Sequence, residues 1–327
     1  MTATIARTVS VYVFLKTDDV EVCTRATDNR GTIWDNTPVG LVVNNTCDEG
    51  FTGHITRACS SGGIWQLPVY NCIRDAVENI GNVVDALSNT SEPEIFNTVL
   101  ADIVSATVQR EIASEKLTNG EMKLLTTSLK TIATVLPAQL VINESILDSF
   151  FDSVDNIIDK NNSDTWQSEP ESTSAVQLVS AVDQIAETLS ENLQPGEKRN
   201  IKNANIALQA QTLAESKIVY PDENVDIEWL NTASSKIELQ PQAFDDVTDQ
   251  VIATAVVYRN LSGILPNTYS KTAGAVTSEE NQINGAILAM TIPSKYSARE
   301  LNPPISITFE HFDKTLSSPI CVYWQKE

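Results

Sequence analysis

Positive charge is scarce in this sequence. Its 327 residues carry 22 Lys and Arg against 43 Asp and Glu, which gives a formal net charge of −21. Proteins that bind a phosphate backbone need clustered cations, so we expect no nucleic-acid partner. The acid excess is typical of solvated helix faces, and an acidic docking surface for a basic protein partner is the alternative interpretation.

Histidine is nearly absent, and the motifs of the common hydrolases and nucleotide-binding enzymes are missing. His54 and His311 fall in different predicted modules, and we expect His54 to be a polar surface residue. The chain contains no Gly-x-Ser-x-Gly, phosphate loop, His-Glu-x-x-His or Cys-x-x-Cys. A Cys321–His311 nucleophile and base is conceivable, but a half-cystine without its partner explains Cys321 better. We therefore expect no enzyme activity, no catalytic residue, no metal site and no cofactor.

Long apolar segments are also missing. No run reaches the roughly 18 apolar residues that a membrane-spanning helix needs. The apolar stretch at residues 9–15 is a poor signal peptide, because no clear small-residue cleavage site follows it. We leave residues 1–20 unassigned, as a β-strand or a mispredicted first exon.

Cysteine is rare overall but concentrated near the beginning of the chain. Four of the five cysteines are Cys23, Cys47, Cys59 and Cys72. This density predicts a small disulfide-stapled module from an oxidising compartment, and spacing alone permits three pairings. Candidate N-glycosylation sequons begin at Asn44, Asn89, Asn143, Asn161 and Asn260. Together these features favour a secreted or cell-surface protein.

Helical periodicity dominates the middle of the chain, from about residue 74 to 199. Apolar residues recur every three to four positions in five segments, which predicts five amphipathic helices with core-facing stripes. The stripes are Ile80, Val83, Val84, Leu87; Ile95, Val99, Ile103, Val104; Met122, Leu125, Leu129, Ile132; Ile146, Phe150, Val154, Ile157; and Leu178, Val182, Ile185, Leu189. Capping boxes are expected at Ser91-Glu92-Pro93-Glu94 and at Thr118-Asn119-Gly120-Glu121. We expect the polar run Asn161–Ser174 to be a loop.

Strand patterns replace the helical period after about Asn200. We expect strands around residues 206–210, 237–239, 251–258, 288–292 and 305–309, with a polar loop over Ser270–Asn284. The β-branched run 251–258 predicts a strand that is buried on both faces, whereas Ile305, Ile307 and Phe309 alternate with polar residues as in a half-buried strand. The order is therefore a disulfide module, a helical subdomain and a β-sandwich, a multidomain α+β chain.

The first module resembles the hormone-receptor motif, HormR, of secretin-type and adhesion receptors. The matching residues are Trp34-x-x-Thr37-x-x-Gly40, Arg57-x-Cys59, Gly63-x-Trp65 and Tyr70-Asn71-Cys72. The resemblance implies the pairs Cys23–Cys59 and Cys47–Cys72, with Trp34, Gly40, Arg57, Gly63 and Trp65 in the core. Four cysteines in place of six make a peptide-hormone role doubtful, and a sushi module remains an alternative.

The end of the chain resembles the GAIN domain of adhesion G-protein-coupled receptors. The resemblance is carried by the strand at 305–309 with Cys321-Val322-Tyr323-Trp324, and by Ala255–Leu265, which is similar to the family's aromatic-basic-Asn-Leu-Gly strand and turn. Cys321, Tyr323 and Trp324 would enter the proteolysis-site (GPS) motif, with Cys321 unpaired. We therefore expect HormR at 21–73, helical GAIN subdomain A at 74–199, and β-sandwich subdomain B at 200–327, ending inside the GPS motif.

Several expectations about function follow from this resemblance. It implies the extracellular recognition and regulatory region of a latrophilin-like adhesion receptor at the plasma membrane, from an incomplete gene model or a fragment. Its partners would be a cell-surface or extracellular protein and, in a longer form, its own seven-helix domain and a G protein. A secreted, non-signalling binding protein with the same modules is the alternative. Self-cleavage in the family needs a His-Leu-Thr or His-Leu-Ser tripeptide, which residues 1–327 do not contain.

Overall fold

A computed structural model of the chain divides it into two compact units. The described residues are 21–89, 92–112, 116–169, 173–213, 217–221, 228–231, 235–245, 247, 251–265, 270–271, 275–276, 283–296, 300–311 and 313–315. One unit contains the chain up to Thr46 together with His54–Val69, and the other contains Cys47–Gly53 and the chain from Tyr70 onward. The predicted GPS residues Cys321, Tyr323 and Trp324 lie outside the described residues.

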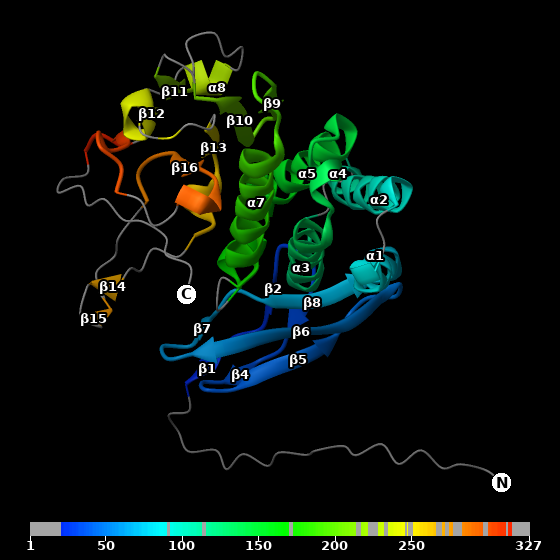
Figure 1. Cartoon of the computed structure of the whole chain (residues 1–327). Coiled ribbons are helices and arrows are strands. Elements are labelled where there is room, and N and C mark those ends of the chain that lie inside the picture. Colours follow the sequence, from blue (N-terminus) through cyan, green and yellow to red (C-terminus); the bar gives the residue numbers. More distant parts are fainter. Residues whose placement is uncertain are drawn as a thin grey trace. The chain divides into compact units, whose positions relative to one another are not determined.

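Short antiparallel strands, blue in Figure 1, build the disulfide module. They are β1 (Val22–Cys23), β2 (Ala26–Thr27), β3 (Ile33–Trp34), β4 (Thr37–Pro38), β5 (Val42–Thr46), β6 (Phe51–Ser60), β7 (Ile64–Trp65) and β8 (Val69–Arg74). Strand β1 pairs with β4 and β2 with β3, while β6 is the central strand, pairing with β5, β7 and β8. The long strand β6 and the strand β8 both run from one compact unit into the other.

The core of the first unit is small and is closed by a disulfide. Cys23 and Cys59 are buried and bonded to each other, with a Cα–Cα distance of 5.8 Å. Trp34 is fully buried, and the guanidinium of Arg57 lies over the rings of both Trp34 and Trp65, 5.6 and 5.2 Å from their centroids. These contacts bring together three of the predicted HormR core residues, Trp34, Arg57 and Trp65.

Helices α1 to α7 form the first part of the second unit (Figure 1). Their bounds are α1 (Asp75–Asp85), η1 (Ala86–Asn89), α2 (Pro93–Ile112), α3 (Asn119–Val135), α4 (Ala138–Val141), α5 (Glu144–Ile157), η2 (Lys160–Asn162), α6 (Ser163–Gln167) and α7 (Thr173–Asn192). The predicted stripes on α3, α5 and α7 are buried in one core cluster, as their periodicity indicated. Ser91 of the first expected capping box lies outside the described residues.

Two details of the helical prediction are wrong. Val83 is 47% exposed, because the buried stripe of α1 consists of Val77, Ile80, Gly81 and Val84. The expected loop Asn161–Ser174 contains η2, α6 and the beginning of α7, and Trp166 within it is 3% exposed. The polar composition of this segment concealed a short helix that buries one aromatic side chain.

The strands of the second unit form two main sheets. Their elements are β9 (Lys198–Lys202), β10 (Ile206–Thr212), β11 (Ile218–Tyr220), α8 (Glu228–Asn231), β12 (Lys236–Leu239), η3 (Pro241–Phe244), β13 (Ile252–Tyr258), η4 (Leu261–Gly263), β14 (Ser270–Lys271), β15 (Ala275–Val276), β16 (Ile287–Thr291), η5 (Ser294–Tyr296) and β17 (Ser306–Thr308). One sheet has the order β16-β13-β10-β9 and the other β11-β12-β17. The small hairpin β14–β15 interrupts the loop that we expected over Ser270–Asn284.

The four-stranded sheet is covered on both faces, which explains why every residue of β13 is buried. Val256 and Tyr258 of β13 belong to the same core cluster as the helices. Helix α7 packs against both β13 and α3. Ala255 and Val257 face the other way and pack with Tyr220 of the second sheet. The prediction of a strand buried on both faces is therefore confirmed, and the strands form a β-sandwich beside the helices.

Strand β17 is less buried than its alternating sequence predicted. It pairs with β12 as an edge strand of the three-stranded sheet. Ile307 is 44% and Phe309 42% exposed, while Ile305 packs against both sandwich clusters. An edge position leaves an alternating apolar face partly in solvent, so the pattern identified the strand but not its burial.

Candidate functional site

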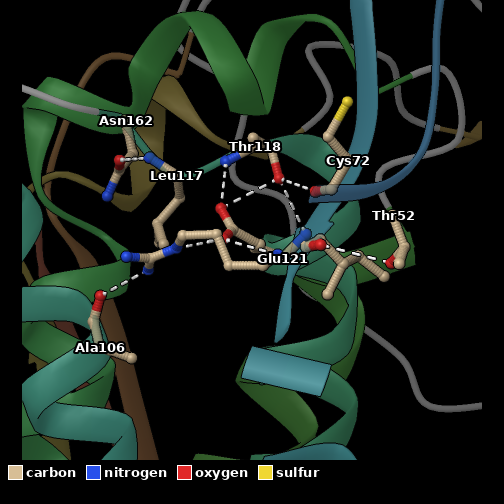
Figure 2. A network of polar contacts seen from close by, with 9 residues as sticks. Thr52, Cys72, Ala106, Leu117, Thr118, Glu121 and Asn162 are labelled. Carbon is tan, nitrogen blue, oxygen red and sulfur yellow. Dashed lines mark hydrogen bonds and ion pairs between the residues drawn. The ribbon is translucent and has the colours of Figure 1, made fainter. Parts of the chain in front are cut away.

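The strand β8 meets the first turn of α3 at what we call the β8–α3 junction, made by Thr52, Cys72, Ile73, Arg74, Thr118, Asn119, Gly120 and Glu121. Figure 2 shows its polar contacts around Thr52, Cys72, Thr118 and Glu121. All of its members belong to the second compact unit. The disulfide Cys47–Cys72, with a Cα–Cα distance of 5.8 Å, joins this strand to the segment Cys47–Gly53. The junction therefore builds the closing disulfide of the first module into the helical unit.

Helix α3 begins with a capping box, and the polar groups of this cap also take part in the β8–α3 junction. The Thr118 hydroxyl accepts from the backbone N–H of Glu121 at 3.1 Å, and the Glu121 carboxylate accepts from the Thr118 N–H at 3.1 Å. The same Thr118 hydroxyl donates to the carbonyl oxygen of Cys72. The cap predicted from sequence is therefore confirmed, and it also holds β8.

Glu121 is fully buried, and its charge is paired. Its Oε1 lies 2.8 Å from Nε of Arg74, whose side chain is 23% exposed. Nη2 of Arg74 also donates to the carbonyl oxygen of Ala106 in α2, at 3.2 Å. A buried carboxylate without such partners would lose its hydration with no compensation, so removing Arg74 would cost several kcal/mol, about 3–5 by analogy with other buried pairs.

Gly120 allows the close approach of β8. A Cβ atom at this position would lie 2.9 Å from the backbone carbon of Asn71 and 2.9 Å from the carbonyl oxygen of Cys72. The neighbouring Asn119 accepts a hydrogen bond from the backbone N–H of Tyr70 at 2.8 Å. The Thr52 hydroxyl donates to the Ile73 carbonyl oxygen at 3.3 Å. The backbone of Tyr70, Cys72 and Ile73 thus fixes the strand, and the Arg74 side chain adds the ion pair with Glu121.

The segment Asn161–Ser174, which sequence analysis assigned to a loop, forms hydrogen bonds with the residues at the start of α3. Asn162 is buried and accepts from the N–H of Leu117 at 3.2 Å, directly before the cap of α3. Thr165 donates its hydroxyl to the Leu117 carbonyl at 2.7 Å, and its own carbonyl accepts from Asn119 Nδ2 at 2.9 Å. The two residues of each of these hydrogen bonds lie more than 40 residues apart in sequence, so local patterns could not predict them. The one sequence signal for burial in this polar segment is the aromatic residue Trp166.

A second polar cluster links the helices to the four-stranded sheet. The Asp155 carboxylate of α5 accepts from the backbone N–H of Asn205 at 2.6 Å, just before β10. Asn205 in turn accepts, through Oδ1, from Nδ2 of Asn260 at the end of β13. Burial raises the pKa of Asp155 from its ordinary value of 3.8 to about 6, and the hydrogen bonds from Asn205 and Ile206 oppose that rise. This cluster gives the helix–sheet contact a titratable group.

The candidate glycosylation sites have different surroundings. Asn44 is exposed on β5, and Asn161 is exposed on η2. Asn143 is exposed and caps α5, since its Oδ1 accepts from the N–H of Ser145 at 3.1 Å. Asn260 is half-buried. Asn89 ends η1.

The candidate metal-ligating and histidine side chains lie apart from one another. Within the described ranges, no three His, Cys, Asp or Glu side chains are grouped as a metal site would require. His54 is exposed on β6, and His311 lies in the other unit, next to Asn284. In the part of the chain that the structure describes, no helix has both the length and the apolar character needed to cross a bilayer.

Comparisons with known proteins agree with the fold and with the order of the modules. The family model of the hormone receptor domain matches residues 20–75, and the GPS family model, described as GAIN subdomain B, matches residues 200–327. Adhesion G protein-coupled receptor B3 of Mus musculus is 18% identical over 316 residues, which is 89% of this chain. The chain spans 20% of the length of that curated relative.

A solved structure shows the same fold across most of the chain. The full extracellular region of zebrafish Gpr126/Adgrg6 superimposes with a TM-score of 0.51 and 12% identity, covering 94% of this chain and 39% of that one. Two domain models in the expected order, a receptor relative and this fold point to one family. The chain is an extracellular region of the adhesion G-protein-coupled receptor family, in which a hormone receptor domain is followed by a GAIN domain.

Proposed function

We propose that this chain recognises a cell-surface or extracellular protein and passes the effect of that binding to a seven-helix domain and its G protein. The β8–α3 junction is the observation that carries the proposal. The strand that closes the Cys47–Cys72 disulfide is held by the backbone and by the buried Arg74–Glu121 pair. A ligand-binding module joined in this way, with no Gly/Ser-rich linker, can transmit a displacement or a load to the helical subdomain.

The excess of acidic residues indicates which kind of protein ligand would bind. A net charge of −21 favours partners with basic surfaces and speeds their encounter at low ionic strength. A plasma-membrane location, with the described domains on the extracellular side, agrees with the disulfides and the sequons. We assign no catalytic residue to the chain, since the His-Leu-Thr or His-Leu-Ser tripeptide of self-cleavage does not occur in residues 1–327.

The test uses a receptor in which this region is followed by its seven-helix domain. Arg74→Met should change basal or ligand-stimulated G-protein signalling at equal cell-surface level, because it loosens the junction without touching the surface of the first unit. Lys236→Met is the matched control, since it removes the ion pair of the exposed Lys236 with the half-buried Glu238, which Lys217 also contacts. Unchanged signalling in a folded, surface-expressed Arg74→Met receptor would contradict the proposed transmission, and a transcript without membrane-spanning coding sequence would favour the secreted alternative.

A further inference from the structure

One face of the β5–β6–β7 sheet presents apolar side chains to solvent. Antiparallel pairing puts Val42 opposite Ala58, and Ser60 opposite Ile64, on the same face of the sheet. Val42 is 63% and Ile64 61% exposed. We call the face formed by Val42, Asn44, Thr56, Ala58, Ser60 and Ile64 the outer face. The opposite face carries Ile55 and Cys59, which are both buried.

The first unit exposes more large apolar side chains than its size explains. Of the ten such residues among those described, six lie between residues 22 and 67: Val22, Ile33, Leu41, Val42, Ile64 and Leu67. Between Val42 on β5 and Ile64 on β7, the outer face of β6 carries the small residues Ala58 and Ser60. An exposed apolar patch of this kind usually marks a surface that something covers.

A modification sequon lies on the same face. Asn44 begins the triplet Asn44-Asn45-Thr46, and its pairing with Thr56 places it on the outer face, two residues after Val42. Residues two apart on a strand are about 6.6 Å apart and point the same way. The Asn44 side chain is exposed and makes no hydrogen bond within the described part of the chain. Its amide nitrogen is therefore available for modification.

We propose that Asn44 carries an N-linked glycan whose first sugars pack over Val42 and extend toward Ile64, so that the cover of the outer face is the chain's own carbohydrate. The apolar ring faces of the sugar remove part of these two side chains from water. The inference rests on an extracellular location for the chain but on no particular ligand. Because the outer face lies wholly in the first unit, it is independent of the β8–α3 junction and of the signalling role.

The covalent step is the ordinary transfer from a lipid-diphosphate-linked oligosaccharide. A bond forms between Nδ2 of Asn44 and C1 of the first sugar, while the bond between C1 and the diphosphate oxygen breaks. The lipid diphosphate leaves with that electron pair, and the amide nitrogen loses one proton to a base. Thr46, which completes the sequon, lies two residues further along β5 and is exposed.

The other sequons provide contrasts for the experiment. Nδ2 of Asn260 already donates to Asn205, so a glycan there would disturb the helix–sheet cluster. Asn161 is also exposed, but it lies on η2 of the second compact unit, whereas the outer face belongs to the first. Asn161 is therefore the control, an exposed sequon outside the outer face.

The first measurement is site occupancy. The whole chain, secreted from cultured animal cells behind an added leader, is digested and analysed by mass spectrometry for glycopeptides. We expect Asn44 to be occupied in most molecules. An unmodified Asn44 in folded, secreted protein would overturn the proposal.

The second measurement asks what the glycan covers. Removing glycans from the folded protein with peptide N-glycosidase, or Asn44→Gln, should increase binding of an apolar fluorescent dye about threefold and lower the unfolding midpoint of the first unit by about 4 °C. Asn161→Gln should change neither. Adding Val42→Ser and Ile64→Ser to Asn44→Gln should return dye binding to the glycosylated level. Equal dye binding in the Asn44→Gln and Asn161→Gln proteins would overturn the proposal, and the enzymatic route keeps the test valid if Asn44→Gln is not secreted.

Discussion

The two compact units of this protein hold themselves together by different means. The first unit buries few large side chains, and a disulfide closes it around Trp34. The second unit has a core cluster that runs from the helices onto one face of the four-stranded sheet, and two further clusters between the sheets. The difference follows from size, since a small module cannot bury enough apolar surface without a covalent constraint.

The second disulfide belongs to the larger unit, although both disulfides come from one sequence module. Cys47 and Cys72 lie with α3, whereas Cys23 and Cys59 lie in the first unit. A module defined by its cysteines is therefore divided between two structural units. The comparison predicts that the two units respond separately to disulfide loss, and that damage at the β8–α3 junction destabilises the second unit.

Arg74→Met is expected to have the largest effect. It removes the ion pair that Arg74 makes with the fully buried Glu121 carboxylate, so we expect the second unit to lose about 3–5 kcal/mol of unfolding free energy. Chemical denaturation followed by far-ultraviolet circular dichroism would measure this loss. The control Lys236→Met removes an exposed lysine from Glu238, which keeps its contact with Lys217, and should cost less than about 1 kcal/mol. Equal losses in the two variants would show that burial at the junction does not matter.

Removing one disulfide at a time should distinguish the stability of the two units. Cys23→Ser with Cys59→Ser should unfold the first unit, because removing a native disulfide from a small domain costs about 2–5 kcal/mol. Amide exchange should then become fast in β5 and β6 but stay slow in α3 and α7. Cys47→Ser with Cys72→Ser should instead increase exchange near the start of α3. If both pairs of substitutions gave the same exchange map, the division of the two disulfides between the units would be wrong.

Gly120→Ala is a milder way to disturb the junction. The new Cβ would meet the backbone of Asn71 and Cys72 at 2.9 Å, so β8 or α3 must shift, at a cost of about 1–3 kcal/mol. Gly263→Ala is the control, because a Cβ added at Gly263 would have no atom within 4 Å. Thermal unfolding of the two variants would measure the difference. A Gly120→Ala protein as stable as Gly263→Ala would mean that the close approach of β8 is not required.

The smallest expected effect is a pH dependence confined to the second unit. The folded pKa of Asp155 is about 6, above its ordinary value of 3.8, so the folded state takes up the proton first. The second unit should therefore gain stability as pH falls from about 6 toward 4, by at most about 1.4 kcal/mol per pH unit. The pKa of Asp148 shifts in the same direction, because of its partial burial and the charges of Glu144 and Asp152.

Asp155→Asn provides the control for this titration. The variant should flatten the slope of unfolding free energy between pH 4 and 6, while the first unit keeps the same slope in both proteins. A slope that Asp155→Asn leaves unchanged would assign the pH dependence to other carboxylates.

Local patterns were sufficient for much of the second unit. The buried stripes of α3, α5 and α7 depend only on the spacing of apolar residues, and the cap at Thr118 depends on residues three apart. The uniform burial of β13 followed from its β-branched run. These features are encoded within one helix turn or one strand, so they can be read without knowing the neighbours.

By itself, then, the sequence determined the order of the modules, the helix faces and the strands, and resemblance supplied the cysteine pairs. The tertiary structure alone decided that Asn162 and Trp166 support α3, that Ile307 and Phe309 stay exposed on an edge strand, and that the closing disulfide belongs to the helical unit. Each of these outcomes depends on partners tens of residues away. Local propensity and periodicity contain no information about such partners, because only the packed chain brings them within hydrogen-bond or van der Waals distance.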